Sequence, residues 1–118
     1  MASEYCEYIL DLMSPHGDVT AKRMFGGYGL YRNGLIFAII ADDALYFKVG
    51  DSNRADYEAA GMRPFSYAKK DREVALTSYW HVPLDVLEDE EMLGAWIDKA
   101  EEVSHGKAAA KVKKKERL

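Results

Sequence analysis

The dipeptide Asn33-Gly34 is the feature that most restricts how this chain can fold. It separates the run Tyr28 to Arg32 from the apolar run Leu35 to Ala41. Asn-Gly between two such runs is the strongest short-range signal for a two-residue β-hairpin, because both turn residues must take positive φ. Leu35 to Ala41 is apolar on both faces, so we place it in the centre of an antiparallel sheet.

Three more strands are predicted from runs of alternating or β-branched residues, at 19–25, 44–49 and 72–81. Asp42-Asp43 forms the turn before the second of these strands. Along the third strand, alternation predicts that Val74, Leu76 and Trp80 share one face. Pro64 to Tyr67 is interpreted as either a short strand or an extended loop.

Helical periodicity marks both ends of the chain. Ser3 is expected to cap a helix that begins at Glu4 and buries an apolar stripe with i, i+4, i+7 and i+8 spacing. A second long helix is predicted from Asp89 to about Val103, and its acidic first turn suits the helix dipole. A short helix that ends at Ala60 is expected between them.

These elements occur in the order helix, three or four strands, short helix, one or two strands, long helix. This order predicts an α+β fold with an antiparallel β-sheet of about five strands. Helices would pack mainly on one face, with the N- and C-terminal helices flanking the sheet. The length of 118 residues suits one domain, which we assign to residues 1–106. We expect residues 107–118 to form a basic, disordered tail.

The net charge of −4 is the sum of two parts of opposite sign. Residues 107–118 have a net charge of +5, which leaves −9 on residues 1–106. The cations of the tail are Lys107, Lys111, Lys113, Lys114, Lys115 and Arg117. The acidic body argues against a uniformly basic nucleic-acid binder. Basic tails, however, often attach acidic domains to nucleic acid, and the alternative is a solubilising tail that has no specific partner.

Cysteine content and hydropathy bear on the cellular compartment. Because Cys6 is the single cysteine, the chain can form neither an internal disulfide nor a multi-thiolate zinc site, which favours a reducing compartment. The N-terminus lacks the basic and apolar regions of a signal peptide. The longest apolar run, Leu35 to Ala41, is far shorter than the roughly 20 residues that span a bilayer. We therefore expect a cytoplasmic protein with no membrane partner.

Several stretches of the chain resemble one known family. They are Arg23-Met24-Phe25-Gly26-Gly27-Tyr28-Gly29-Leu30-Tyr31, Asp43 to Lys48, Pro64 to Tyr67, and Tyr79 to Pro83 followed by Val86 to Asp89. Together they resemble the N-terminal domain of the TfoX/Sxy family, which are bacterial regulators of competence for DNA uptake. The similarity extends from about Glu4 to Val103.

The resemblance implies both a fold and a role. The implied fold is a compact α+β domain of the type III secretion chaperone-like kind. The implied role lies in transcriptional regulation, as a coactivator that acts through protein contacts rather than by reading DNA sequence. The best-known members carry a second, helical domain, whereas fifteen residues follow Val103 here, so we expect a stand-alone N-terminal domain. The resemblance brings no catalytic residues with it.

The predicted interaction surface is centred on the glycine-rich segment. Gly26-Gly27-Tyr28-Gly29 differs from the dinucleotide-binding pattern G-x-G-x-x-G, so we interpret it as a bulge or bend between two strands. The predicted contact residues are Arg23, Tyr28, Tyr31 and Arg32, with the charge of Arg23 beside exposed tyrosines. The cations of the tail would add electrostatic affinity.

No catalytic, cofactor or metal site is predicted. His16, His81 and His105 lie far apart in the sequence and lack the i, i+4 spacing of a helical metal site. The acidic run Glu88 to Glu91 lacks EF-hand spacing and is explained by a helix N-terminus. Cys6 is expected to be a small buried hydrophobic residue, and a catalytic pair of Cys6 with His81 is the alternative.

Our leading hypothesis is a non-enzymatic interaction domain whose partner is a protein, in particular a transcription regulator complex. A second hypothesis is a secretion-chaperone-like module that binds an extended segment and forms a homodimer. A third is weak, nonspecific binding of nucleic acid through the tail. The tyrosines on the predicted strands suit core packing, a protein interface or base stacking, and these interpretations remain open.

Overall fold

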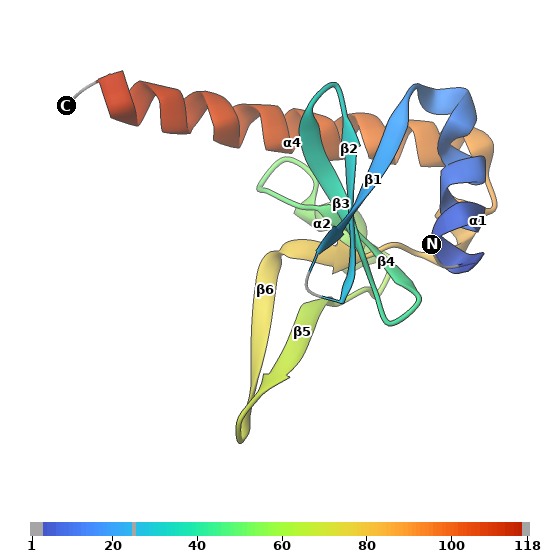
Figure 1. The fold of residues 1–118 in the computed structure, drawn as a ribbon, viewed down its shortest axis with the longest axis horizontal. Coiled ribbons are helices and arrows are strands. Elements are labelled where there is room, and N and C mark those ends of the chain that lie inside the picture. Colours follow the sequence, from blue (N-terminus) through green and yellow to red (C-terminus); the bar gives the residue numbers. More distant parts are fainter. Residues whose placement is uncertain (1–3, 25, 117–118) are drawn as a thin grey trace.

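The computed structural model describes the backbone of residues 4–24 and 26–116 and the side chains of residues 4–24 and 26–106. It contains a six-stranded antiparallel sheet with the strand order β1-β2-β3-β4-β6-β5 (Figure 1). The strands are β1 (Val19–Met24), β2 (Gly27–Arg32), β3 (Leu35–Ala41), β4 (Ala44–Lys48), β5 (Pro64–Lys69) and β6 (Arg72–His81). The predicted α+β class is confirmed, and the segment that was left open at 64–67 is part of a strand. The likeness to type III secretion chaperones stays a prediction.

Positive φ angles form the turns on both sides of β3. Asn33 and Gly34 have φ angles of 55° and 77°, and Asp42 and Asp43 have φ angles of 50° and 55°. This combination is the one that type I′ hairpin turns require. The predicted Asn33-Gly34 hairpin is confirmed, and β3 lies inside the sheet with β2 and β4 as its neighbours.

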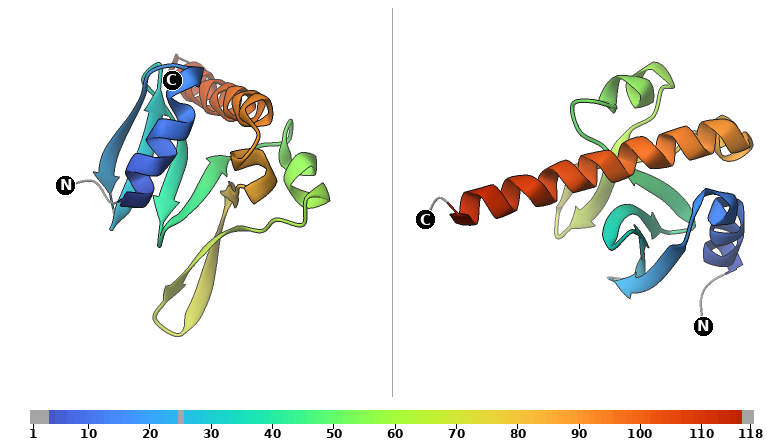
Figure 2. Two further views of the ribbon diagram at one scale, coloured as in Figure 1. Left: turned by 90° about the vertical axis from the view of Figure 1, so that its right-hand side faces the viewer. Right: turned by 90° about the horizontal axis from the view of Figure 1, so that it is seen from above.

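The helices pack on one face of the sheet (Figure 2). They are α1 (Glu4–Met13), the 3-10 helix η1 (Ser14–His16), α2 (Arg54–Ala59), α3 (Leu84–Leu87) and α4 (Glu90–Glu116). Helix α4 lies over β3 and β4, and α1 lies against β1. An ion pair between Lys99 and Asp56, with an N–O distance of 3.0 Å, joins α4 to α2. Of the described helices, none is long and apolar enough to cross a membrane.

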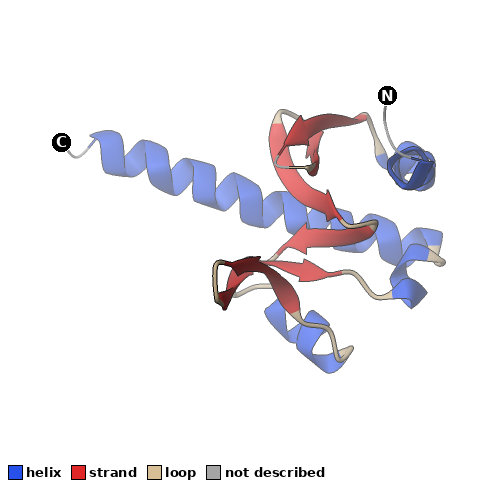
Figure 3. Cartoon of the chain, turned by 60° about the horizontal axis from the view of Figure 1, so that its bottom comes forward, coloured by secondary structure: helices blue, strands red, loops and turns tan. Residues whose placement is uncertain are grey.

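Helix α4 is longer than its apolar stripe predicted. It begins as expected, because the Asp89 carboxylate accepts a hydrogen bond from the Met92 N–H at 3.1 Å. It then continues to Glu116 rather than ending near Val103, and Figure 3 shows its last turns extending beyond the sheet. The alanines and lysines that follow Gly106 are strong helix formers, which explains the extension.

Three expectations fall on residues that the structure does not describe. The Ser3 cap and the end of the first strand at Phe25 lie outside the described residues. The side chains of residues 107–118 do so as well, and the assignment of this segment to a basic tail outside the domain stays a prediction.

The hydrophobic core lies between the sheet and the helices. Its members are Cys6, Ile9 and Met13 of α1, Leu30 of β2, Phe37, Ala38 and Ile40 of β3, Leu45 and Phe47 of β4, Tyr57 of α2, Trp80 of β6, Val86 and Leu87 of α3, and Leu93, Ile97 and Ala100 of α4, together with Val49 and Val82. The rings of Phe37 and Phe47 have centroids 5.8 Å apart. Cys6 is fully buried, which confirms the expectation of a small buried hydrophobic residue.

The expectation that Leu76 and Trp80 share a face of β6 is wrong. Trp80 is 8% exposed and belongs to the core, whereas Leu76 is 39% exposed and lies on the opposite face. The adjacent residues Pro64 and Phe65 of β5 pair with Trp80 and Leu76, so the register of the two strands shifts at this point. An irregularity of this kind interrupts the two-residue period and reverses the face that later side chains occupy.

Candidate interaction surface on the sheet

Strand alternation directs every second side chain away from the helices. We call this second side of the sheet the open face. Its residues are Thr20, Lys22 and Met24 of β1, Gly29 and Tyr31 of β2, Ile36 and Ile39 of β3, Tyr46 and Lys48 of β4, Phe65, Tyr67 and Lys69 of β5, and Arg72, Val74, Leu76, Tyr79 and His81 of β6. Within the described chain, no helix packs on this face.

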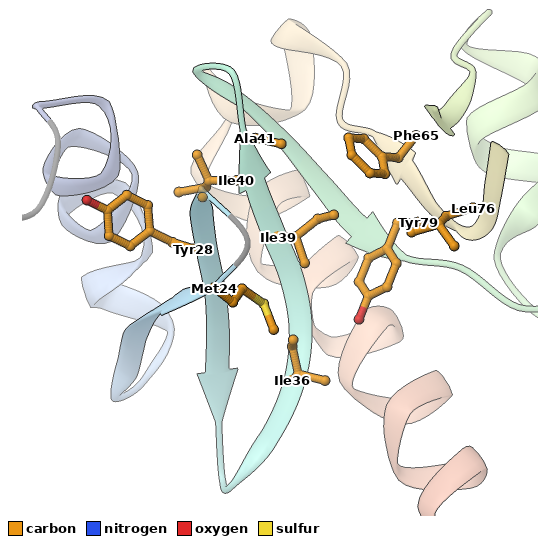
Figure 4. Close-up of a pocket in the computed structure, with 10 residues that line it drawn as sticks. Met24, Tyr28, Ile36, Ile39, Ile40, Ala41, Phe65, Leu76 and Tyr79 are labelled. Carbon is orange, nitrogen blue, oxygen red and sulfur yellow. The ribbon is translucent and has the colours of Figure 1, made fainter. Parts of the chain in front are cut away.

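A groove of about 220 Å³ lies in the open face, between β3 and the hairpin of β5 and β6. Its apolar lining includes Met24, Ile36, Ile39, Phe65, Leu76 and Tyr79. Figure 4 shows Ile39 facing Tyr79 across the groove, whereas Tyr28 and Ile40 point to the other side of the strands. The hairpin projects away from the body of the domain and forms the far wall (Figure 1).

Two glycines let β2 lie close to its neighbours. A Cβ atom at Gly27 would come within 2.1 Å of the carbonyl oxygen of Ile40 on β3. A Cβ atom at Gly29 would lie 2.9 Å from Sδ of Met24 and 3.0 Å from Cδ1 of Ile36. The absence of a side chain at these positions therefore permits the strand spacing and leaves room for the groove floor.

The bend that the sequence predicted near these glycines is a tight turn. Met24 pairs with Gly27, and Gly26 between them has a φ of 79°. A register shift does occur in β2, but it lies farther along, between Leu30 and Tyr31.

Two lysines of the open face lie over tyrosine rings. Nζ of Lys22 is 5.0 Å from the ring centroid of Tyr31, and Nζ of Lys48 is 4.6 Å from that of Tyr79. Nζ of Lys48 also donates a hydrogen bond to the Tyr79 hydroxyl at 3.4 Å. Burial, together with the neighbouring Tyr31, raises the pKa of Tyr79 above its ordinary value. The Tyr79 phenol therefore stays neutral at neutral pH, and each of the two rings has a lysine ammonium group over it.

Further aromatic rings continue this face toward the hairpin. The Phe65 ring lies 4.9 Å from that of Tyr46 in an edge-to-face arrangement and 6.1 Å from that of Tyr67. The Tyr46 ring is also 5.4 Å from the His81 ring. Burial raises the pKa of Tyr46, and the negative charge of Asp42 raises it further. Large amphipathic rings of this kind are typical of protein interfaces.

Of the residues predicted from the sequence, Arg23 and Tyr28 pair across β1 and β2. They lie on the helix side of these strands, since Ala21, two residues before Arg23, packs against the core. Arg23 is exposed as expected. Tyr28, by contrast, is half-buried and packs against the core, so it is not the exposed tyrosine that the sequence suggested. Tyr31 is the one of the four that lies on the open face, under Lys22.

Arg32 makes its contacts inside the domain. Its guanidinium donates hydrogen bonds to Glu101 at 2.7 Å, to Asp98 at 2.8 Å and to the carbonyl oxygen of His16 at 2.9 Å. The side chain is 11% exposed and joins β2 to η1 and α4. The four predicted contact residues therefore do not share one face, and their role in partner binding stays a prediction.

The chain is similar in sequence to known proteins. A family model described as the TfoX N-terminal domain matches residues 11–104. The chain belongs to this family. A relative in Aliivibrio fischeri, DNA transformation protein TfoX1, is 29% identical over 76 residues, which are 64% of this chain and 36% of that protein. The chain thus spans little more than a third of that relative's length. The resemblance inferred from the sequence is confirmed.

The histidines and the cysteine of this TfoX N-terminal domain lie apart from one another. Cys6 is buried under α1, where burial raises the pKa of its thiol, whereas His81 is exposed on the open face. The sheet separates them, so they form no catalytic pair. His16 lies against Gly94 of α4, and His105 is exposed. Among the described residues, no group of three His, Cys, Asp or Glu side chains could hold a metal ion.

Sequence reasoning missed the groove residues of this TfoX N-terminal domain. Ile36 and Ile39 escaped notice because β3 is apolar on both faces, so its pattern alone cannot tell core from surface. A usable signal was present in β4, where Tyr46 and Lys48 alternate with buried residues. Strand β3 is apolar on both faces, and the outward residues of its neighbour β4 are Tyr and Lys. This combination indicates that one face of the sheet is not covered by helices and is partly apolar.

Proposed function

We propose that this TfoX N-terminal domain is a non-enzymatic adaptor in the bacterial cytoplasm. It acts in transcriptional regulation of the competence type, as a coactivator that contacts a partner protein through its open face. The observation that carries the proposal is the apolar groove in a sheet face to which none of the described helices packs. Membership of the family and the relation to a DNA transformation protein support the regulatory setting.

The size and composition of the groove favour a protein partner. Its volume of about 220 Å³ is smaller than the roughly 300–1,000 Å³ of pockets that hold drug-sized ligands. Exposed apolar patches with a polar rim mark interaction sites in soluble domains. The groove therefore suits one or two side chains of another protein better than it suits a cofactor or a small substrate.

Affinity purification of the tagged chain from a native bacterial extract tests the proposal. The variant Ile39→Glu places a charge in the groove wall, and Met92→Glu, at an exposed apolar residue of α4, is its matched control. We expect transcription proteins to be recovered with the unaltered chain and with Met92→Glu, and to be lost with Ile39→Glu. Recovery of metabolic enzymes alone, or equal recovery with both variants, would overturn the proposal.

A second candidate function rests on the extension of α4. The backbone of this helix runs to Glu116, and its last turns extend beyond the sheet (Figure 3). The sequence of segment 107–118 contains six cations. If its six cations contacted duplex phosphates, log K would fall against log salt with a slope of about −5. The intact chain and a chain that ends at Gly106 are compared by DNA binding at several salt concentrations. Equal affinities of the two chains for DNA would show that the segment does not contribute to DNA binding.

A further inference from the structure

The charged strand residues of the open face all carry the same sign. Within strands β1 to β6, Glu73 is the one carboxylate. Glu73 pairs with Ala68, next to the pair of Val74 with Tyr67, and successive pairs of an antiparallel ladder point to opposite faces. Glu73 is therefore directed away from the open face. This face carries no strand carboxylate, although residues 1–106 have a net charge of −9.

Four cations lie on the open face, at two places. Lys22 and Lys48 lie over Tyr31 and Tyr79 beside the groove. The other two, Lys69 and Arg72, pair with each other at the end of the hairpin that forms the far wall. Asp42, in the turn after β3, is a carboxylate at the rim, next to Tyr46. A partner that covers the face from β1 to the hairpin meets a predominantly positive surface, so charge complementarity calls for an acidic partner.

The centre of the same face calls for an apolar group. The groove wall is formed by Ile36 and Ile39 on one side and by Leu76 and the Tyr79 ring on the other, with the ring of Phe65 above them (Figure 4). Burying one large apolar side chain in such a groove favours binding. The surface thus combines an apolar socket with flanking positive charges.

These features favour a peptide over a nucleic acid. Stacking of a base requires an accessible ring face with cations to the side of it. The rings of Tyr31 and Tyr79 instead have an ammonium group directly over them. The Phe65 ring packs against Tyr46 and Tyr67, and the groove beside it is lined in part by the aliphatic side chains of Ile36, Ile39 and Leu76.

We propose that the open face binds an extended acidic segment of a partner protein. One large apolar side chain enters the groove, and carboxylates on either side of it meet Lys22 and Lys48. Because alternate side chains of an extended chain point to the same side, the recognised pattern is acidic-x-apolar-x-acidic. This inference rests on the proposed function, since it specifies the partner that contacts the open face.

Selection from a random nine-residue peptide library displayed on phage, with the purified full chain as bait, tests the proposal. We expect the enriched peptides to contain one Leu, Ile, Met or Phe with Asp or Glu two residues away on one or both sides. The paired variant Lys22→Glu, Lys48→Glu should bind these peptides at least tenfold more weakly. Added salt should weaken binding of the unaltered chain.

The matched control is Lys99→Glu, which reverses an exposed cation of α4, on the helix side of the sheet. It should bind the selected peptides as the unaltered chain does. Lys22→Gln, Lys48→Gln should give intermediate affinity. Circular dichroism and a thermal midpoint check that each variant is folded.

Several results would overturn the inference. These are enrichment of basic or neutral peptides, equal losses with Lys99→Glu, or binding of an oligothymidine strand more tightly than any peptide. If sedimentation shows that the chain is a homodimer, and Ile39→Glu dissociates it, the open face binds a second copy of the chain instead. Ile39→Glu could abolish recovery of the native partner while the library yields no acidic peptides. That result would support the proposed function and show that the inference of an acidic partner is wrong.

Discussion

Arg32 at the end of β2 donates a hydrogen bond from Nε to the Glu101 carboxylate of α4 at 2.7 Å. Its Nη2 reaches Asp98 of the same helix at 2.8 Å, and its Nη1 reaches the carbonyl oxygen of His16. The planar fork of an arginine can serve these three acceptors at once, whereas a lysine cannot. The side chain is 11% exposed, so the pair is desolvated more than a surface ion pair is. Arg32 therefore fixes α4 against the end of β2.

Replacement of this guanidinium should destabilise the domain. Arg32→Ala leaves Glu101 half-buried without its cation, and we expect the free energy of unfolding to fall by about 2 kcal/mol. Arg32→Lys should recover less than half of this loss. Exposed Arg23→Ala is the control and should change the value by less than about 0.5 kcal/mol. Urea titrations measure all three, and equal effects of Arg32→Ala and Arg23→Ala would contradict the structural role.

Gly27 and Gly26 should respond very differently to a methyl group. A Cβ atom at Gly27 would meet the Ile40 carbonyl oxygen at 2.1 Å, so Gly27→Ala must displace backbone and should cost more than about 3 kcal/mol. At Gly26 there is open space, and Gly26→Ala should cost only about 1 kcal/mol for its positive φ. Thermal denaturation distinguishes these values. Similar losses for the two variants would show that β2 and β3 are not in such close contact.

The turn between β3 and β4 offers a stabilising substitution. Asp43 adopts a left-handed φ of 55°. This conformation is unfavourable for an L-residue but not for glycine. Glycine gains more entropy on unfolding, so the net gain expected for Asp43→Gly is about 0.5 kcal/mol. Gly34→Ala, at the matching turn after β2, should change stability in the opposite direction. Chemical denaturation of both variants checks the signs, and a destabilised Asp43→Gly would refute this account.

Tyr57 should make the domain sensitive to alkaline pH. Burial raises its pKa well above the ordinary value of 10.0, so the unfolded chain loses this proton first as pH rises. Its contribution to stability is complete below pH 10 and falls as pH rises above that value. The buried hydroxyl has no hydrogen-bond partner among the described residues. Tyr57→Phe should therefore leave stability at pH 7 unchanged or raise it by up to about 1 kcal/mol.

Urea unfolding at pH 7 and pH 11 measures this effect. The difference in unfolding free energy between the two pH values should be smaller for Tyr57→Phe than for the unaltered chain. Tyr8→Phe, at a residue that is 47% exposed, is the control and should leave the difference unchanged. A pH dependence that is the same in all three proteins would contradict the burial of Tyr57.

Much of the fold could be predicted because its signals are local. The Asn33-Gly34 turn and the runs at Leu35–Ala41 and Arg72–His81 gave strands whose bounds the structure confirms. Each depends on residues that are neighbours in sequence, on turn chemistry and on the strand period. The extension of α4 past Val103 was missed because no apolar stripe marks it.

The candidate site depended on contacts between residues distant in sequence. Arg32 looked like a surface cation, and its burial results from Asp98 and Glu101 on a helix more than sixty residues away. Leu76 reached the groove only because a register shift between β5 and β6 separates its face from that of Trp80.

The sequence by itself determined most of the secondary-structure elements, the type I′ turn at Asn33-Gly34, the burial of Cys6 and the resemblance to the TfoX N-terminal domain. Only the tertiary structure decided which side of the sheet each strand residue occupies. A shift of one residue in strand pairing moves a whole set of side chains to the other face, and nothing local encodes that shift. The helices then cover one face, and the cations and apolar residues directed to the other face form the groove surface.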